Sequence, residues 1–580
     1  MANYIDYEYS GTKQDPTGIV VWEQNYETRK VEEKTYNLND YLYFYVDYID
    51  KKKIVPGVTS QRGTQVQKIE VDNYKSLKSG EAAKSYRDLK LNTYESDIEP
   101  IHKAMLDNYG IDHQKATQWN LALYDIETDV QTEDTFMEMR ENANREINAI
   151  SVWYAKPNKF YNFTVVPPML RDEWDFDNVE QRGNFEILYF DNEKDMLEAF
   201  FEVTKMYDTI ALGAWNGDFF DTKYIFDRCK QIWNEKGAAQ RMGRFHKVRK
   251  NKVMRGDKEE LVVRPIGMIW YDCLEAFKWN GPELESFALN AVVEEVLGTS
   301  KVDFEGSFET LYHGTRKDRD RFLELTPDKN RKKLLQISKE LGEMIISDLG
   351  LYKEAQAQIE LENSVEEHEK ETRIQIEITD RLTELFKSKE IQDELGASIE
   401  DLERFILYKR FLDTYRLFID YSNQDSKLLY DLELKLEKFK TMMMLAQYNV
   451  SSFYDVFATL KQVEQGITNF AHLYNKKVVI DRDYDKTKQA YNKFIDKDLL
   501  NIRINNDYKI SPDDSKEIKR MKVLTSQAKI PGAHVLLPSV GLISFEEEHT
   551  PRLAREFKSL KAQLKEIDAQ LALLESEEEI

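Results

Sequence analysis

The chain has 580 residues, of which 41% are hydrophobic, 12% aromatic and 32% charged, and its formal net charge at pH 7 is −23. This length exceeds what one hydrophobic core supports and predicts about two to four domains. The negative net charge argues against uniform coating of nucleic acid or of an anionic membrane, and the two cysteines, Cys229 and Cys273, exclude a disulfide framework.

The N-terminal residues, 1–118, mix short apolar alternations with turns rich in Gly, Pro and Asn, which predicts a small mixed α/β unit. The first residues lack the basic start and apolar run of a signal peptide, and no run of about eighteen apolar residues occurs anywhere. We therefore expect a cytoplasmic protein without a membrane partner.

From residue 119 to about 300, predicted strands alternate with predicted helices, which indicates an α/β sheet domain. The strands are expected at 121–128, 145–155, 160–167 and 208–215, and the helices at 193–206 and 221–237. From about 327 to 420 the chain is rich in Lys, Glu, Gln and Leu and has one proline, Pro327. Amphipathic helices at 330–350 and 369–390 predict a helical subdomain there, and mixed helix and strand resume from 421 to about 540.

The last segment, 550–580, predicts a helix with Thr550 as N-cap and Pro551 at the first helical position. Its apolar residues alternate in spacings of four and three, the heptad pattern of a coiled coil: Leu553, Phe557, Leu560, Leu564, Ile567, Leu571 and Leu574. The seam favours docking to a partner helix only slightly over packing on the same chain.

Carboxylates stand out at three places. In "LALYDIETDV", Asp125 and Glu127 follow an apolar run and, being two residues apart, face the same side of a strand. Asp221 follows "NGDFF" near the start of a predicted helix, and Tyr421 and Asp425 lie one turn apart on another. Taken singly, these residues would be a solvated strand end, an N-cap and a half-exposed helix face.

Taken together, "DIE", "NGDFFD" and "YSNQD" resemble the motifs D-x-E, N-x-x-x-F-D and Y-x-x-x-D of the DEDDy class of 3′→5′ exonucleases. The spacing of the second motif is that of family B DNA polymerases. Further stretches, among them "EILYFDNEKDMLEAFFEVTKMYDTIALGAW" and "IGMIWYDCLEAFKW", are similar to the exonuclease core of T-even-like phage polymerases.

The resemblance implies an α/β fold with an RNase-H-like exonuclease domain at 119–437. A mixed α/β N-terminal domain at 1–118 would be completed by about 438–538. The helical block at about 315–405 has no expected counterpart in that family and is treated as an insertion.

The resemblance also implies the chemistry of the site, which uses two Mg²⁺ or Mn²⁺ ions. Asp125, Glu127 and Asp425 would hold one ion, Asp125 would bridge to a second, and Asp221 would support that ion largely through water. Tyr421, helped by Glu127, would orient the attacking water, and a 5′-mononucleotide would leave the DNA 3′ end. Such ions also resolve the cost of crowding carboxylates.

The most basic stretch, from 241 to 264, alternates around a Gly-Asp turn and predicts a β-hairpin. A solvated hairpin is one interpretation, and by resemblance a hairpin here helps hold the separated primer end through phosphate contacts. Phe220 would stack on terminal bases, although core packing explains it equally well. The expected DNA-binding residues are Asn216, Phe220, Arg244, Lys247, Arg249, Lys250, Lys252 and Arg255.

The polymerising motifs of the family do not occur in this sequence. The strand "GLISF" runs into Glu546 where the palm would have a metal-binding Asp, and there is neither an Asp-Thr-Asp nor the Lys-x-x-x-Asn-Ser-x-Tyr-Gly of the fingers. Residues 539–549 are therefore expected to be a truncated palm-entry strand, followed by the docking helix at 550–580.

These observations predict a proofreading exonuclease subunit of a split phage polymerase, acting in the host cytoplasm. The expected partners are single-stranded DNA 3′ ends, primer-template DNA and a second subunit with palm, fingers and thumb. The sequence does not decide whether a sliding clamp also binds. Two alternatives remain: a catalytically silent subunit that binds DNA and its partner, and a free-standing DEDD exonuclease.

Overall fold

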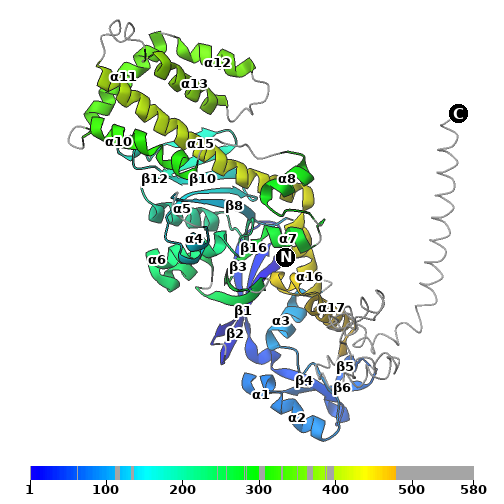
Figure 1. Cartoon of the computed structure of the whole chain (residues 1–580). Helices are drawn as coiled ribbons and strands as arrows, with labels where there is room; N and C mark the ends of the chain where they lie inside the picture. The colour runs from blue at the N-terminus through cyan, green and yellow to red at the C-terminus, as the bar shows by residue number, and fades with distance from the viewer. Residues whose placement is uncertain are drawn as a thin grey trace, which may run out of the picture. The chain divides into compact units, whose positions relative to one another are not determined.

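The computed structural model describes residues 2–477 apart from short gaps (Figure 1). The gaps are residues 13, 62, 111–117, 132–135, 245, 256–257, 280, 283, 300–306, 328–330, 349, 362–369, 386 and 388–397. The expected palm-entry strand, the heptad helix and the part of 438–538 beyond residue 477 lie outside the described residues. Within the described part, no helix is both long and apolar enough to cross a bilayer.

The chain divides into two compact units, each assembled from separate stretches of sequence. Unit 1 comprises Met1–Tyr7, Val21–Lys34 and Lys115–Met444, and unit 2 comprises Glu8–Val20, Thr35–Gln114 and Leu445–Ile580. A three-stranded sheet in the order β1-β2-β3 contributes residues to both: β1 (Ala2–Gly11), β2 (Pro16–Asn25) and β3 (Val31–Asn37).

Unit 2 contains a five-stranded sheet in the order β17-β5-β6-β4-β7. Its strands are β4 (Tyr43–Asp47), β5 (Ile54–Ser60), β6 (Gln65–Glu70), β7 (Thr93–Tyr94) and β17 (Lys476–Lys477). Its helices are α1 (Tyr74–Lys78), α2 (Glu81–Asp88), α3 (Pro100–Tyr109) and α17 (Thr459–Leu473), with the short 3₁₀ turns Leu38–Tyr41, Lys51–Lys53 and Phe453–Phe457. Strand β17 runs parallel to β5, so a segment near residue 477 completes a sheet begun near residue 43.

Unit 1 is built on a seven-stranded sheet in the order β11-β12-β10-β9-β8-β13-β16. Its strands are β8 (Leu121–Thr128), β9 (Ile147–Tyr154), β10 (Lys159–Val165), β11 (Val179–Arg182), β12 (Phe185–Phe190), β13 (Ala211–Ala214) and β16 (Ile269–Asp272). Strands β8, β9 and β10 form an antiparallel meander, while β13 pairs parallel with both β8 and β16. All four predicted strands are present, and the predicted α/β fold class is confirmed.

Helices cover both faces of this sheet (Figure 1). The alternate residues Ala122, Tyr124 and Ile126 of β8 point into a core shared with α5 (Glu193–Met206) and α6 (Asp221–Met242). The intervening residues, which include Asp125 and Glu127, therefore face the opposite side, where α15 (Ile399–Leu436) crosses the sheet. The remaining elements of this unit are α4 (Phe136–Asn142), the 3₁₀ turn Arg171–Glu173, α7 (Cys273–Trp279), α8 (Leu289–Leu297) and the hairpin β14 (Val248–Arg255) and β15 (Lys258–Pro265).

The helical block predicted within 315–405 is present and packs in two places. The described helices in this range are α10 (Arg316–Leu325), α11 (Arg331–Asp348), α12 (Leu351–Leu361) and α13 (Lys370–Leu385), and α9 (Phe308–His313) directly precedes them. Leucines and isoleucines of α11 to α13 form a small core with Leu402 and Phe405 of α15. Phe322 and Leu335, by contrast, join the core that contains Phe185 and Tyr189 of β12, so the block also packs on the sheet.

Helix α15 runs without interruption through the expected boundary between the helical block and the following segment. Its 38 residues contain neither proline nor glycine, and apolar side chains recur at helical spacing from Leu402 to Leu432. Sequence composition changes near residue 420, but the helix does not. One helix therefore carries both the contact surface of the inserted block and the third motif.

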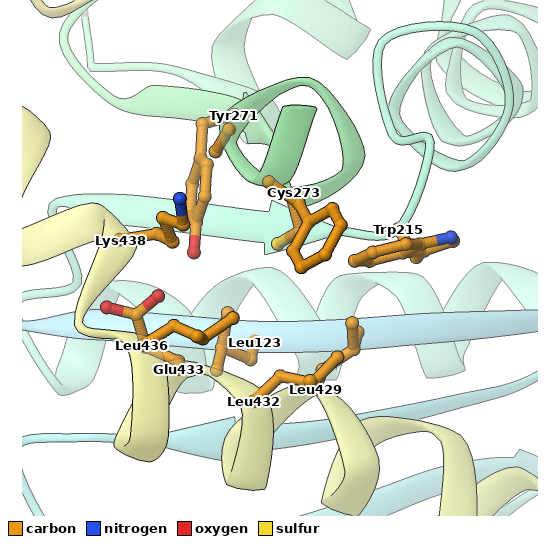
Figure 2. Close-up of a pocket in the computed structure, with 11 residues that line it drawn as sticks. Leu123, Trp215, Tyr271, Cys273, Leu429, Leu432, Glu433, Leu436 and Lys438 are labelled. Carbon is orange, nitrogen blue, oxygen red and sulfur yellow. The ribbon is translucent and has the colours of Figure 1, made fainter. Parts of the chain in front are cut away.

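Beyond the third motif, α15 encloses a mostly apolar pocket against β8, β16 and α7 (Figure 2). The half-buried carboxylate of Glu433 lies at one end, beside Lys438. Burial raises the pKa of Glu433 to about 7. Its oxygens accept the backbone N–H of Phe439 at 3.0 and 3.2 Å, in the first turn of α16 (Lys438–Asn449). Glu433 is thus accounted for as a helix cap.

Candidate active site

Asp125 and Glu127 lie at the end of β8 that α15 covers, and both are half-buried. The strand places them on one face because its neighbours Tyr124 and Ile126, both buried, fill the opposite core. The two carboxylates are therefore held by a well-packed strand, although they repel each other. This is the juxtaposition that the alternation in "LALYDIET" predicts.

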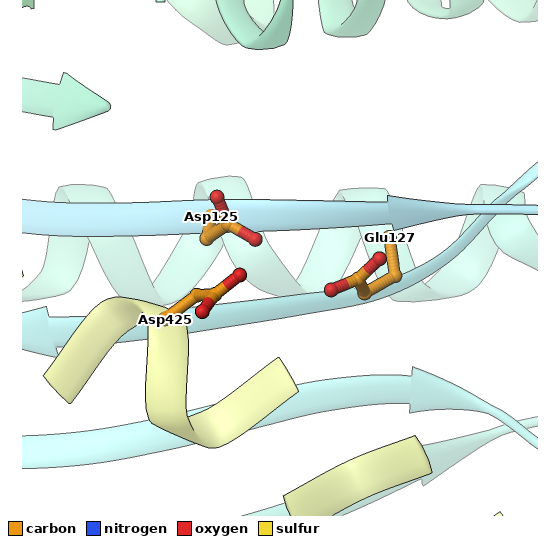
Figure 3. A group of neighbouring side chains, drawn as sticks. All are labelled: Asp125, Glu127 and Asp425. Carbon is orange, nitrogen blue, oxygen red and sulfur yellow. The ribbon is translucent and has the colours of Figure 1, made fainter. Parts of the chain in front are cut away.

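Asp425 of α15 meets them from the other side (Figure 3). A carboxylate oxygen from each of Asp125, Glu127 and Asp425 lies within 4.8 Å of the others. Asp425 is 7% exposed, so its charge is largely withdrawn from water. Three carboxylates from positions 300 residues apart thus converge on one point, and crowding of like charges at such depth favours a bound cation.

Tyr421 precedes Asp425 by one helical turn and is half-buried. The ring of Phe308, from α9, packs edge-on against the Tyr421 ring with 5.0 Å between the ring centres. The tyrosine is therefore held between its own helix and α9. Sequence reasoning did not single out Phe308, because an isolated phenylalanine at a helix start has no motif of its own.

Asp221 is the first residue of α6 and is 3% exposed. Burial raises the pKa of its carboxyl to about 8, and the nearby carboxylates of Asp272 and Asp425 act in the same direction, while the backbone N–H of Ile126 donates to it and opposes the shift. Asp221 therefore reaches the backbone between Asp125 and Glu127. It lies outside the 4.8 Å group but close to it.

The turn before Asp221 explains the asparagine of the second motif. Asn216 has a φ of 62°, in the left-handed region that Asn tolerates better than most residues. Its carbonyl oxygen accepts the backbone N–H groups of Phe219 at 3.1 Å and Phe220 at 3.0 Å. This turn ends β13 and aims the first residue of α6 at the site.

Two acidic residues that sequence reasoning missed support this turn. Asp272, at the end of β16, accepts the N–H of Leu274 at 2.9 Å and that of Asp218 at 3.3 Å. Burial raises the pKa of Asp272 to about 7, and the Asp218 carboxylate adds to that. Asp218 in turn pairs with Arg264 of β15 at 2.7 Å. The sequence carries no signal for these two residues, because the parallel pairing of β16 with β13 that brings Asp272 to this turn is seen only in the fold.

The donor set fits a hard divalent cation. Asp125, Glu127 and Asp425 offer carboxylate oxygens, the ligands that Mg²⁺ and Mn²⁺ prefer, and no His or Cys belongs to this group among the described residues. The three carboxylates can therefore bind a divalent metal ion. Asp221 adds a fourth carboxylate at the edge of the same site.

The predicted basic hairpin is confirmed as β14 and β15, paired from Val248 and Pro265 to Arg255 and Lys258. Lys247, Lys250 and Lys252 are exposed. Lys250 and Lys252 pair with Glu235 and Glu259, each at 2.8 Å. Such surface pairs contribute little to stability and leave the ammonium groups accessible to phosphate.

The two arginines flanking this surface are directed into the protein instead. Arg244 donates to the carbonyl oxygen of Thr209 at 2.9 Å, and burial lowers its pKa. Arg249 donates to the carbonyl oxygen of Tyr7 at 3.0 Å and pairs with Asp6 at 3.6 Å. Both anchor the hairpin to the sheet around it. The side chain of Arg255 lies outside the described ones.

Phe220 is half-buried and packs against the core below the sheet, with its ring centre 5.5 Å from that of Tyr224. Core packing therefore accounts for much of its surface. Phe219, next to it, is buried. A base could reach only the remaining exposed part of Phe220.

Comparisons with known proteins bear on this site. Residues 40–292 match the family described as DNA polymerase family B, exonuclease domain. The DNA-directed DNA polymerases of Escherichia phage RB69 and Enterobacteria phage T4 are each 27% identical to this chain, over 222 and 187 residues. These alignments cover 35% and 29% of this chain, and 24% and 20% of the phage proteins.

A DNA polymerase of Thermococcus litoralis is 26% identical over 215 residues, which is 36% of this chain and 11% of that protein. The alignments thus span a quarter or less of each relative. Asp125, Glu127 and Asp221 fall within the family match, whereas Tyr421 and Asp425 lie beyond it on α15, which brings Asp425 to the site. Residues 40–292 of this chain therefore match the exonuclease domain of family B DNA polymerases, and parts of the chain are similar to phage members of that family.

Proposed function

We propose that this chain is a proofreading 3′→5′ exonuclease that hydrolyses the terminal phosphodiester of DNA 3′ ends and releases 5′-mononucleotides. One observation carries the proposal. Asp125, Glu127 and Asp425, drawn from a strand and a distant helix, present oxygens within 4.8 Å of one another. The family match to an exonuclease domain supports the same reading.

Asp125, Glu127 and Asp425 would hold the metal ions, and Asp221 would act on the second ion largely through water. Two such ions, when bound, supply positive charge for the attacking and leaving oxygens of an in-line displacement. Tyr421 holds the attacking water by its hydroxyl, and Glu127 accepts a hydrogen bond from that water. The packing of Phe308 on Tyr421 restricts the tyrosine ring.

DNA reaches this site as a single-stranded 3′ end separated from its template. The exposed lysines of the β14–β15 hairpin, Lys247, Lys250 and Lys252, bind phosphates, and the exposed edge of Phe220 contacts a terminal base. Phosphate contacts of this kind position the strand without reading its sequence. The substrate is therefore any DNA 3′ end rather than a particular sequence.

The nuclease proposal is tested with a 5′-labelled single-stranded oligonucleotide and Mg²⁺. We expect stepwise shortening of the labelled strand. Asp425→Ala should abolish it, because the variant removes a metal ligand. Asp431→Ala is the matched control, since Asp431 lies on the same helix and pairs with Lys427.

Early release of the label as a mononucleotide would instead indicate digestion from the 5′ end. Equal activity of Asp425→Ala and the wild type would remove the site from the mechanism. No activity at all, with or without a polymerising partner, would leave a DNA-binding subunit as the function.

We further propose that the polymerising residues lie on a second subunit, which the heptad segment binds. The 580 residues contain no Asp-Thr-Asp motif, and the seam from Leu553 to Leu574 suits a partner helix. The assembled enzyme would act on primer-template DNA in the host cytoplasm.

A further inference from the structure

A row of polar side chains crosses the sheet beneath α15. Asp125 of β8 lies directly opposite Ser151 of β9, and Ser151 lies opposite Asn162 of β10. Ser151 and Asn162 are fully buried. Polar groups at such depth are costly unless they are hydrogen-bonded, so the partners of this row indicate why it is there.

Both partners lie on α15 between Tyr421 and Asp425. The Ser151 hydroxyl donates to the carbonyl oxygen of Ser422 at 2.6 Å. The Asn162 amide donates to the side-chain oxygen of Asn423 at 2.8 Å. The sheet thus holds the turn of α15 that carries the third motif by directed contacts as well as by apolar packing.

A third contact comes from the end of β11. The Arg182 guanidinium donates to both oxygens of Asp420, at 3.0 and 2.8 Å, and the two side chains are only 6% and 8% exposed. A bidentate pair of this kind fixes orientation as well as distance. Asp420 is the residue immediately before Tyr421, so the pair sets the rotation of α15 at the site.

The inserted helical block completes the arrangement. The hydroxyl of Thr372, from α13, donates to Asp420 Oδ2 at 2.6 Å and is also contacted by Arg182. Thr372 is 1% exposed. Asp420 is therefore held between the sheet on one side and the inserted block on the other.

We propose that Arg182 and Thr372 are positioning residues for the nuclease site, and that the inserted block serves as a brace for α15. Apolar packing is non-directional and would let α15 slide or turn on the sheet. The Asp420 contacts fix its register, so that Tyr421 and Asp425 face Asp125 and Glu127. This inference rests on the proposed nuclease function.

The chain offers a matched pair of variants for the test. Thr379, on the same helix as Thr372, donates in the same way to the buried Asp413 of α15. Asp413 lies twelve residues before Asp425, about 18 Å along the helix, whereas Asp420 lies five residues before it, about 8 Å. Thr372→Val and Thr379→Val therefore remove the same group from the same interface at different distances from the site.

We expect Thr372→Val to lower kcat about tenfold with KM for DNA unchanged, because small misplacements of reacting groups are costly. Binding of Mn²⁺, followed by the electron paramagnetic resonance signal of the free ion, should weaken in parallel. Thr379→Val should lose similar thermal stability yet keep kcat and Mn²⁺ affinity within about twofold of wild type.

Arg182→Met should lower kcat and weaken Mn²⁺ binding further, and Arg182→Lys should restore part of both because it keeps the charge but not the bidentate geometry. Arg404→Met is the control. Arg404 is also buried on α15 and is bound to Asp401 and the carbonyl oxygen of Leu325, but it lies about 25 Å from Tyr421.

Equal kcat and Mn²⁺ affinity in Thr372→Val and Thr379→Val, at equal stability, would overturn the positioning role while leaving the nuclease proposal intact. A wild-type protein that binds Mn²⁺ but hydrolyses no DNA would overturn the nuclease proposal, and the Mn²⁺ affinities of the variants would still decide the positioning role. A wild type that neither binds Mn²⁺ nor hydrolyses DNA would overturn both.

Discussion

Asp221 is a carboxyl that folding makes hard to ionise. Burial raises its pKa to about 8 in the folded protein, whereas an unfolded aspartate titrates near 3.9. Its contribution to stability is therefore fully present below about pH 4 and is lost as the pH rises toward 8, because only the unfolded state readily gives up the proton. Without metal, the protein carries this cost at neutral pH.

Asp221→Asn should therefore stabilise the metal-free protein while abolishing exonuclease activity. The gain in Tm over wild type should be small near pH 4, grow steadily to about pH 8, and shrink when Mg²⁺ binds and stabilises the wild-type site. Thermal melts at several pH values with chelator or Mg²⁺ would measure it. Asp227→Asn, a half-buried position on the same helix, should show no such trend.

Tyr421 offers a second test at this scale. Tyr421→Phe keeps the ring that Phe308 contacts but removes the hydroxyl proposed to hold the attacking water. We expect kcat to fall about a hundredfold, the lower end of the range typical of a group that assists proton transfer, with Mn²⁺ affinity unchanged. Unchanged kcat in single-turnover digestion would exclude the hydroxyl from the reaction.

Single residues also show what sequence could not reveal. Asp125 and Glu127 were predictable, because their alternation with apolar neighbours fixes the face they share. Asp272 and Asp218 were not, since each resembles an ordinary turn residue until the pairing of β16 with β13 brings the turns together. Arg182 and Thr372 had no sequence signal, because their shared partner Asp420 is 238 and 48 residues away.

At the scale of elements, the β14–β15 hairpin was readable from its basic residues and Gly-Asp turn. Lys250 and Lys252 lie two residues apart in β14 and therefore share one exposed face. That face is the proposed phosphate-binding surface. Arg244 and Arg249, which the same basic pattern includes, bind backbone carbonyl groups instead.

The double variant Lys250→Ala and Lys252→Ala should weaken binding of single-stranded DNA and lower the slope of log affinity against log salt by about 1.4, since each lost phosphate contact removes about 0.7. Fluorescence anisotropy at several salt concentrations would measure the slope. The exposed pair Lys332 and Lys333 of α11, changed in the same way, should leave it unaltered. Identical slopes in both double variants would exclude the hairpin as a phosphate-binding surface.

Helix α15 is the element for which the amino-acid composition predicted a boundary that the structure does not have. Its N-terminal half is rich in Lys, Glu and Leu like the inserted block, and its later turns carry the third motif, so the change in composition suggested a boundary. No proline or glycine interrupts it, and that absence was the better guide. Helix continuity follows from local propensity, whereas composition follows from what each stretch packs against.

At the scale of the whole molecule, the fold class and the exonuclease domain were predictable, and the assembly of the second unit from separate stretches of sequence was not. The second unit combines residues from both ends of the described chain, with β17 near residue 477 beside β5 near residue 59. A two-residue strand leaves no pattern in sequence. The second and third motifs are also far apart in the sequence, and only the family resemblance predicted that they meet.

The proposed partner subunit can be tested on the full chain through the heptad seam. Leu564→Glu with Leu571→Glu places charge in the seam and should abolish co-purification with a polymerising subunit, because a buried unpaired charge is costly. Ala562→Glu with Ala569→Glu adds the same charge on the outer face of that predicted helix and should leave co-purification intact. Retention of the partner by both would refute docking through this segment.

The packing of the inserted helices has a practical consequence for anyone who would shorten this protein. Phe322, Leu325 and Leu335 belong to the same core as Phe185, Ile187 and Tyr189 of β12. Excising residues 315–405 would therefore expose the apolar side chains at an edge of the central sheet and leave an aggregation-prone surface. The block cannot be removed without loss of core packing, and a shortened version of this chain must keep it.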